Sequence, residues 1–307
     1  MTTFAKYLVI FINMTAMRTK LLIMAALLGF CLTAGAGNVT KSYDLTFNGI
    51  EVSNKFDIQL IKADTHSVTI EVDSEYAPYL SVTTEAGILK VRFKKLPVKM
   101  QIMKDAFKMT IRTPMVNFID LSGACKLTCT DEFSLGMNNF RATISGACTV
   151  NTLKINTVDA SLRVTGNSRV FIDGEFSDFE AKIEGASRLT FNGRASDFDA
   201  EVVASSELNV TGILPDVNVA VRGASKAEFA GQGGEFDAEV GGASRLRAEE
   251  FPVVNAKVEV KGASSVTVDA SESLKADISG ASNCKYRDRA GLRLNPAVSG
   301  GGSFKTL

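Results

Sequence analysis

The sequence has no tryptophan and only one histidine, His66, in 307 residues. A nucleophilic serine needs a neighbouring base, so one histidine cannot support a catalytic triad at many repeated positions. A surplus of positive charge is absent as well, because 34 Lys and Arg residues balance 34 Asp and Glu residues. Without a basic surplus the composition argues against nucleic acid as a partner.

Long apolar runs are absent from most of the chain, and the clearest one lies near the N-terminus. The run "LLIMAALLGF" follows Arg18 and Lys20 and is followed by Ala34-Gly35-Ala36. This order of a basic segment, an apolar segment and small residues is typical of a secretory signal peptide. The run is shorter than the roughly 20 residues that a spanning helix needs. The sequence therefore predicts a signal peptide over residues 1–36, cut near Ala36.

Cys31 leaves a lipoprotein alternative open. Phe30 precedes it at a position where a small residue is expected, which favours ordinary cleavage. Either route predicts an exported protein in the periplasm, on the outer-membrane surface or outside the cell. Such compartments are oxidising.

A short phrase returns at nearly constant spacing through the last two thirds of the chain. Its marker is the first residue of Gly-Ala-Ser or Gly-Ala-Cys, with variants at the third, fifth and last copies. The marker falls at Gly123, Gly146, Gly166, Gly185, Ala204, Gly223, Gly242, Gly262, Gly280 and Gly300. A period of about 20 residues is the signature of a repeat architecture.

Apolar residues alternate with polar ones on both sides of each marker. Around Gly185 the apolar positions are Phe179, Ala181, Ile183, Leu189 and Phe191. Period-two alternation predicts strands with one buried face. Each unit is therefore predicted to be a strand, a Gly-Ala-Ser bend, a second strand and a polar turn such as "FNGRASD".

One short unit cannot bury its own inner face, but stacked units can. We therefore predict an all-β fold, a parallel β-solenoid of about ten rungs that is right-handed, over residues 116–307. An antiparallel sandwich would explain the alternation but not the near-constant register of the columns. Residues 37–115 also alternate, and they are predicted to form an N-terminal β cap or the first irregular rungs.

Several phrases together resemble one bacterial family. They are "NGIEVSNKFDIQLIKADTHSVTIEVD", "AGILKVRF", the recurring "SGAC", "EGAS", "RGAS", "GGAS" and "KGAS", and the closing "SGGGSFK". The chain resembles, over roughly residues 44–304, the exported head GIN-domain proteins described as auto-transporter adhesins. This resemblance implies an exported β-helical binding protein and no catalytic residues.

Two sets of side chains are candidates for ligand contact. Basic residues lie three positions after the marker and form a predicted stripe that could meet an anionic glycan or balance acidic neighbours. Its members are Arg169, Arg188, Lys226 and Arg245. Tyr76 and Tyr79, in "SEYAPYL", are the best candidates for surface aromatics, although packing inside the N-terminal region explains them equally well.

Stacked carboxylates form a further candidate site, for a cation. Glu180, Asp199 and Asp237 share the column five residues before the marker, where they could coordinate Ca²⁺. Lys257 continues the same column, as in a solvated face of mixed charge. We predict no metal and no cofactor.

The position two after the marker holds small polar residues, which predicts a structural ladder. Its serines include Ser168, Ser187, Ser225, Ser244, Ser264 and Ser282. If these hydroxyls face inward, they satisfy buried backbone groups between rungs. Cys125 and Cys148 occupy the same column, where a bridge would be strained, so buried free thiols are favoured and a disulfide stays open.

These observations favour a non-enzymatic, adhesin-like binding protein of the cell envelope or surface. The partner is an unknown glycan or protein, and homo-oligomers by edge or face association are compatible with the fold. Two alternatives stay open. One is a carbohydrate-active β-helix enzyme, and the other is a structural envelope component that assembles end to end.

Overall fold

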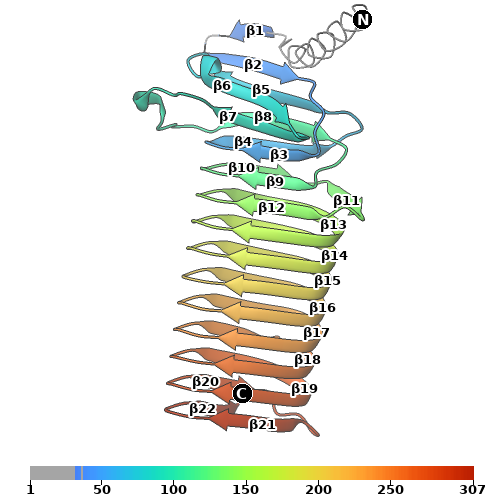
Figure 1. Cartoon of the computed structure of the whole chain (residues 1–307), viewed down its shortest axis with the longest axis vertical. Helices are drawn as coiled ribbons and strands as arrows, with labels where there is room; N and C mark the ends of the chain where they lie inside the picture. Colours follow the sequence, from blue (N-terminus) through green and yellow to red (C-terminus); the bar gives the residue numbers. More distant parts are fainter. Residues whose placement is uncertain (1–31, 36) are drawn as a thin grey trace, which may run out of the picture.

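The computed structural model describes residues 32–35 and 37–307, and it shows an all-β solenoid of about ten stacked rungs (Figure 1). The predicted signal peptide lies outside the described residues except for residues 32–35, which form strand β1. No helix in the described part of the chain has the length and apolar character to cross a membrane.

The strands of the N-terminal part are short. They are β1 (Leu32–Gly35), β2 (Asn38–Tyr43), β3 (Gly49–Val52), β4 (Phe56–Lys62), β5 (Ser67–Asp73), β6 (Leu80–Glu85), β7 (Ile88–Phe93), β8 (Phe107–Thr113), β9 (Phe118–Leu121), β10 (Lys126–Cys129), β11 (Glu132–Gly136) and β12 (Phe140–Ile144). Two 3₁₀ turns lie between them, η1 (Ala77–Tyr79) and η2 (Val98–Met100).

The strands of the repeat are long. They are β13 (Thr149–Val164), β14 (Arg169–Ile183), β15 (Arg188–Val202), β16 (Glu207–Val221), β17 (Lys226–Val240), β18 (Arg245–Val260) and β19 (Ser265–Ile278), followed by the short β20 (Asn283–Tyr286), β21 (Arg293–Val298) and β22 (Ser303–Thr306).

Successive rungs pair in parallel and in register. Ile183 lies opposite Val202, and Val202 lies opposite Val221 on the next rung. Residues that are 19 positions apart in the sequence are therefore neighbours across a strand pair. This pairing confirms the parallel solenoid and excludes the antiparallel sandwich.

The structure differs from the prediction at the polar turns, because these segments do not interrupt the strands. Each rung from β13 to β19 is one long strand that continues through segments such as "FNGRASD". Glycines stack there in a column, with Gly193 opposite Gly174 and opposite Gly212. A Cβ on Gly193 would lie 1.9 Å from the carbonyl oxygen of Gly174. Without side chains the backbones approach closely enough to keep pairing through the bend.

The Gly-Ala-Ser segment forms the corner between consecutive long strands. Gly185 has φ +84°, a left-handed conformation that glycine adopts at little cost. The amide of Ala186 donates to the carbonyl of Gly166, so the corners are hydrogen-bonded to each other. Ala204 occupies the marker position of its rung with φ 70°.

The rungs of the N-terminal region do not follow the order of the sequence. β3 pairs in parallel with both β7 and β9, and β4 pairs in parallel with both β8 and β10. The rung of β3 and β4 is therefore inserted between two rungs that come later in the chain. β2, β5 and β8 pair antiparallel, beyond these rungs.

The core runs along the inside of the solenoid as columns of like side chains. Phe179 and Phe198 stack with their ring centroids 5.4 Å apart, and Phe191 packs against both rings. These residues are at most 1% exposed. Because inward and outward positions alternate along each strand, the residues between them form equally regular columns on the surface.

Candidate functional site

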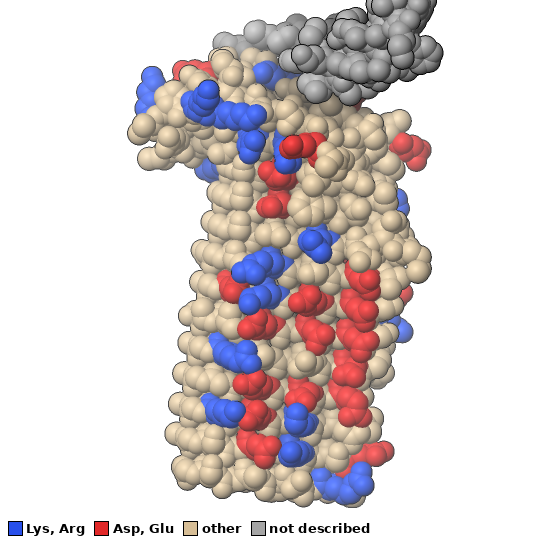
Figure 2. Space-filling model, viewed as in Figure 1, with Lys and Arg blue, Asp and Glu red and all other residues tan. Residues whose placement is uncertain are grey.

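The strand segment before each corner presents three outward columns on one face of the solenoid. They lie seven, five and three residues before the marker. Figure 2 shows this face, where acidic side chains form rows along the axis of β13–β19. Since neighbouring parallel strands are about 4.8 Å apart, each column repeats its chemistry at that spacing.

The column three residues before the marker is neutralised by ion pairs. Glu201 lies 2.8 Å from the Nζ atom of Lys182, and Glu239 pairs with Arg222. Glu259 pairs with Lys261 at 2.6 Å. Lysine hydrogen bonding lowers the pKa of Glu201, as expected for a carboxylate beside a cation. This column is a solvated ion-pair network.

The column seven residues before the marker has a different electrostatic character. We call it the carboxylate column, and its members are Asp159, Asp178, Asp197, Asp216 and Glu235. Within residues 37–307 none of the five forms an ion pair. Partial burial, and then the charges of Asp197 and Glu235, raise the pKa of Asp216. Like charges therefore accumulate here without a paired cation within residues 37–307.

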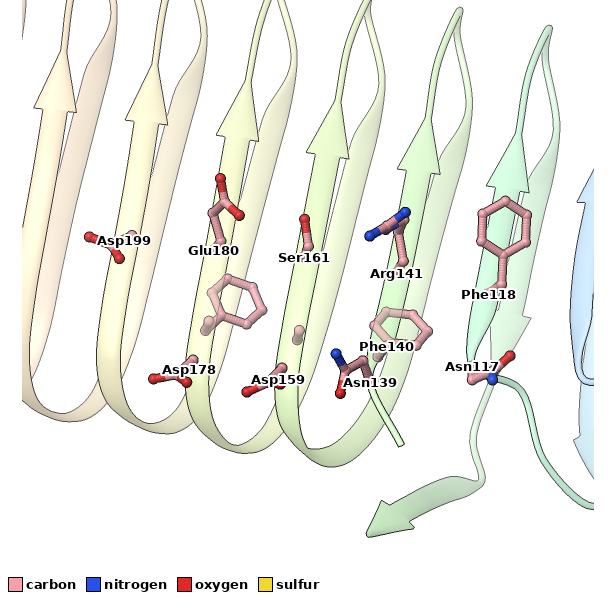
Figure 3. A pocket seen from close by; sticks show the side chains of 12 residues that line it. Asn117, Phe118, Asn139, Phe140, Arg141, Asp159, Ser161, Asp178, Glu180 and Asp199 are labelled. Atoms are coloured by element: carbon pink, nitrogen blue, oxygen red, sulfur yellow. The ribbon is translucent and has the colours of Figure 1, made fainter. Parts of the chain in front are cut away.

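A groove of about 520 Å³ opens at the N-terminal end of the carboxylate column (Figure 3). One row of its lining comes from consecutive rungs in register and consists of Phe118, Arg141, Ser161, Glu180 and Asp199. The second row contains Asn117, Asn139, Asp159 and Asp178. The small side chain of Ser161 lies between the larger Arg141 and Glu180, which leaves space between rungs.

The lining of the groove combines aromatic, cationic, amide and carboxylate side chains. Phe118 is half-buried and offers part of an aromatic face, while Arg141 is exposed and has no ion pair within residues 37–307. Amides of Asn117 and Asn139 both donate and accept hydrogen bonds, and carboxylates accept them. We call this site the groove.

The predicted basic stripe lies on a different face, beyond the corner. Arg169 is opposite Arg188, and Lys226 is opposite Arg245. Glu207 occupies the rung between Arg188 and Lys226, and its carboxylate accepts from Arg188 Nε at 3.0 Å. The stripe is therefore divided by an ion pair, and it is separate from the groove.

The two tyrosine candidates lie in the N-terminal region, where they pack against the core. The ring of Tyr76 is 5.0 Å from the ring of Phe107 and 5.8 Å from that of Phe93. Tyr79 ends η1 and is also partly buried. The structure therefore does not bring the tyrosines together with the basic stripe.

The serine column lies inside the corner, where all its members are buried. Ser168 is 0% exposed, and its hydroxyl lies 3.4 Å from the carbonyl of Gly146. The amide of Ser225 lies 3.3 Å from the hydroxyl of Ser244 on the next rung. Ser206 also belongs to the column, and its hydroxyl is the one buried side-chain oxygen within residues 37–307 that has no partner. Hydroxyls in this position are closed to a substrate.

The cysteines of the described part of the chain are free and buried. Cys125 and Cys148 lie on adjacent rungs, with the Cys125 amide 3.3 Å from the Cys148 sulfur. Burial raises the pKa of Cys284 to about 12 and that of Cys129 to about 11. These thiols act as small apolar side chains.

The predicted cation candidates share one column. Glu180 is opposite Asp199, but Asn218 separates Asp199 from Asp237, and Asp237 pairs with Lys257 at 2.6 Å. Within the described ranges no three acidic, histidine or cysteine side chains form a cluster that could hold a metal ion. His66 lies 3.3 Å from the hydroxyl of Thr113, in the N-terminal region.

Neither the carboxylate column nor the groove was predicted from the sequence. A signal for the column was present, because an acidic residue recurs seven positions before five consecutive markers. No comparable signal existed for the groove. Phe118 and Arg141 are 23 residues apart, and their pairing depends on the irregular segment around β11.

Comparison with known proteins agrees with the architecture. The model of the family described as "Putative auto-transporter adhesin, head GIN domain" matches residues 46–214 and 183–290. The chain belongs to this family. The match covers most of the solenoid, including the groove and the carboxylate column. Among proteins with curated descriptions, none matches the sequence.

Several solved structures resemble this chain in fold. A protein from Parabacteroides distasonis titled a putative adhesin is 16% identical with a TM-score of 0.49, and the match covers 88% of this chain and 97% of that one. A putative adhesin from Parabacteroides merdae is 16% identical (TM-score 0.45; 90% and 98% covered). A second Parabacteroides distasonis protein, titled a putative lipid binding protein, is 14% identical (TM-score 0.46; 90% and 99% covered).

Proposed function

We propose that this protein is an exported, non-enzymatic binding protein of the cell envelope or cell surface, and that it holds a glycan in the groove. The observation that carries the proposal is the lining of the groove. An aromatic face, an arginine without an ion pair, two amides and several carboxylates converge in one open space. The carboxylate column continues from the groove along the solenoid, so an elongated ligand has a further surface to follow.

The positions of the serine hydroxyls and of the single histidine also favour a binding role over catalysis. The serines of the ladder are buried, and the single histidine lies in the N-terminal region beside Thr113 rather than in the groove. The family description names an adhesin, which is likewise a binding function.

The test is a glycan array followed by titration of the best ligand with four variants. Arg141→Ala removes the groove cation, Asp178→Asn removes one groove carboxylate, and Phe118→Ala removes the aromatic face. An aromatic contact is worth about 1 kcal/mol, which corresponds to roughly fivefold in Kd. Arg245→Ala, on the basic stripe, is the matched control for Arg141→Ala. Circular dichroism confirms that each variant is folded.

Each outcome separates the competing functions. Weaker binding by the three groove variants with Arg245→Ala unchanged supports the proposal. Weaker binding by Arg245→Ala alone places the ligand on the basic stripe and refutes it. Turnover across a polysaccharide panel would show an enzyme instead, and growing particles in light scattering would show end-to-end assembly.

A further inference from the structure

The loop between β7 and β8 differs from the rest of the surface. We call residues 94–106 the lysine arm; its sequence is "KKLPVKMQIMKDA". Figure 1 shows this segment projecting sideways from the N-terminal end of the solenoid. At its tip Val98 is 82% exposed and Ile102 is 86% exposed. Two large apolar side chains therefore stand in water on a projecting loop.

The exposure of these two side chains follows from how the arm is anchored. Met100 is buried, and Leu96 and Met103 pack against the core. The 3₁₀ turn η2 closes with the Met100 amide 2.8 Å from the Pro97 carbonyl. With Met100 directed inward by this turn, Val98 and Ile102 on either side of it face outward.

The base of the arm is tied to the first rungs. Lys55 Nζ donates to the carbonyl of Met103 at 3.1 Å, and the Phe107 amide donates to the carbonyl of Lys55. The apolar tip is thus held away from the core by packing and hydrogen bonds.

Positive charge surrounds the tip. The arm has four exposed lysines, Lys94, Lys95, Lys99 and Lys104, and one acidic residue, Asp105. None of the four lysines forms an ion pair within residues 37–307. Basic side chains are visible on the projection in Figure 2.

We propose that the lysine arm is a docking site for the surface of an anionic phospholipid bilayer. Val98 and Ile102 enter the boundary between headgroups and acyl chains, and the four lysines contact the headgroup phosphates. Apolar insertion combined with lysine attraction is how peripheral proteins bind anionic membranes.

Two features favour a bilayer over a protein partner. The apolar tip is small and convex, whereas a stable protein interface buries about 800 Å² on each partner. All the basic residues are lysines, which act as point charges on a diffuse anionic surface, whereas bidentate recognition favours arginine.

The experiment is vesicle co-sedimentation with the exported, purified protein. The vesicles contain phosphatidylcholine alone or phosphatidylcholine with about one third phosphatidylglycerol. We expect binding to the anionic vesicles, loss of binding at high salt because charge attraction is screened, and little binding to the neutral vesicles. Each lysine contributes about fivefold to the partition coefficient.

Two variants test the two components of the surface, each with a matched control. V98S/I102S removes the apolar tip, and Met137→Ser is its control because Met137 is also 86% exposed, in the loop after β11. Replacement of the four arm lysines by Gln removes the charge. Its control replaces four exposed lysines elsewhere, Lys126, Lys226, Lys285 and Lys305, by Gln.

The proposal holds if both arm variants lose binding and both controls keep it. A fluorophore sensitive to polarity on Ile102→Cys should then shift to the blue with anionic vesicles only, since the other described cysteines are buried. Equal binding by arm and control variants overturns the proposal. So does binding of the arm to a soluble sulfated polysaccharide without binding to vesicles, because the site would then be a polyanion site.

Discussion

Glycines occupy two columns of the solenoid for different physical reasons, and substitution by alanine separates these reasons. At the corner, Gly185 has φ +84° and a Cβ there would lie 2.6 Å from the Gly166 carbonyl oxygen. Inside the long strand, Gly193 has φ +142° and its Cβ would lie 1.9 Å from the Gly174 carbonyl oxygen. Real Cβ atoms essentially never approach closer than 3.0 Å.

The corner has room to adjust, because Ala204 already occupies the marker position of the next rung with φ 70°. Gly185→Ala therefore costs mainly the left-handed conformation, about 1–2 kcal/mol. Gly193→Ala must push two paired backbones apart by about 1 Å, which breaks hydrogen bonds on both sides. The cost of the glycine-only conformation adds to the lost hydrogen bonds, so we expect Gly193→Ala to lower the free energy of unfolding by about 3–5 kcal/mol.

Two further glycines isolate the two causes. Gly291 has φ +86° and nothing within 4 Å of its Cβ position, so Gly291→Ala measures the conformational cost alone. Gly212 has no positive φ, but its Cβ would lie 2.1 Å from the Gly193 carbonyl oxygen, so Gly212→Ala measures the steric cost. We expect Gly193→Ala to be the most destabilising, followed by Gly212→Ala, with Gly185→Ala and Gly291→Ala last.

The assay is urea unfolding followed by far-ultraviolet circular dichroism, because the chain has no tryptophan. Midpoints and slopes are both compared, since stacked repeats can lose two-state behaviour. If Gly185→Ala destabilised the protein as much as Gly193→Ala, the explanation would be wrong. The strand glycines would then not be required for the close approach of the backbones.

Three further predictions concern the interior and the charged face. Ser225→Ala should destabilise by about 1 kcal/mol because its hydroxyl donates to the Arg222 carbonyl at 2.9 Å, whereas Ser206→Ala should be neutral in the same urea titration because its hydroxyl has no partner. Asp216→Asn should raise the thermal midpoint at neutral pH, because it removes a charge that its acidic neighbours repel. The wild-type protein should gain stability as the pH falls through the raised folded pKa of Asp216, and the variant should lack this gain. A lower midpoint for the variant at neutral pH would contradict repulsion between these carboxylates. Burial raises the pKa of Cys284 to about 12, so stability should fall as pH rises from about 9 towards 12, and Cys284→Ala should flatten that slope.

Much of the fold was predictable because the spacing of the marker residues directly gives the period of the repeat. Alternation around Gly185 and Ala204 identifies the inner and outer faces, and constant spacing identifies the stacking. The unbroken strands were not predicted. The segment "FNGRASD" has the composition of a turn, but its Gly193 stacks on Gly174 and Gly212, which lets backbone pairing continue there.

The candidate site was less predictable than the fold. A column such as the basic stripe can be located by counting residues from the marker of each repeat. Whether a charge in that column is neutralised depends on the side chains of the neighbouring rungs. Glu207 pairs with Arg188 across rungs, while the carboxylate column finds no such partner within residues 37–307. The lysine arm does not repeat, so no periodicity in the sequence shows that Met100 is buried while Val98 and Ile102 are exposed.

The sequence by itself determined that about ten coils of roughly 20 residues stack in parallel, because period and alternation are local properties that every copy repeats. The tertiary structure alone decided the order of the first rungs, with β3 and β4 inserted between later strands, and it alone created the groove. Those features depend on contacts between residues that are far apart in the chain and do not repeat. No local pattern encodes such contacts, so they exist only once the chain has folded.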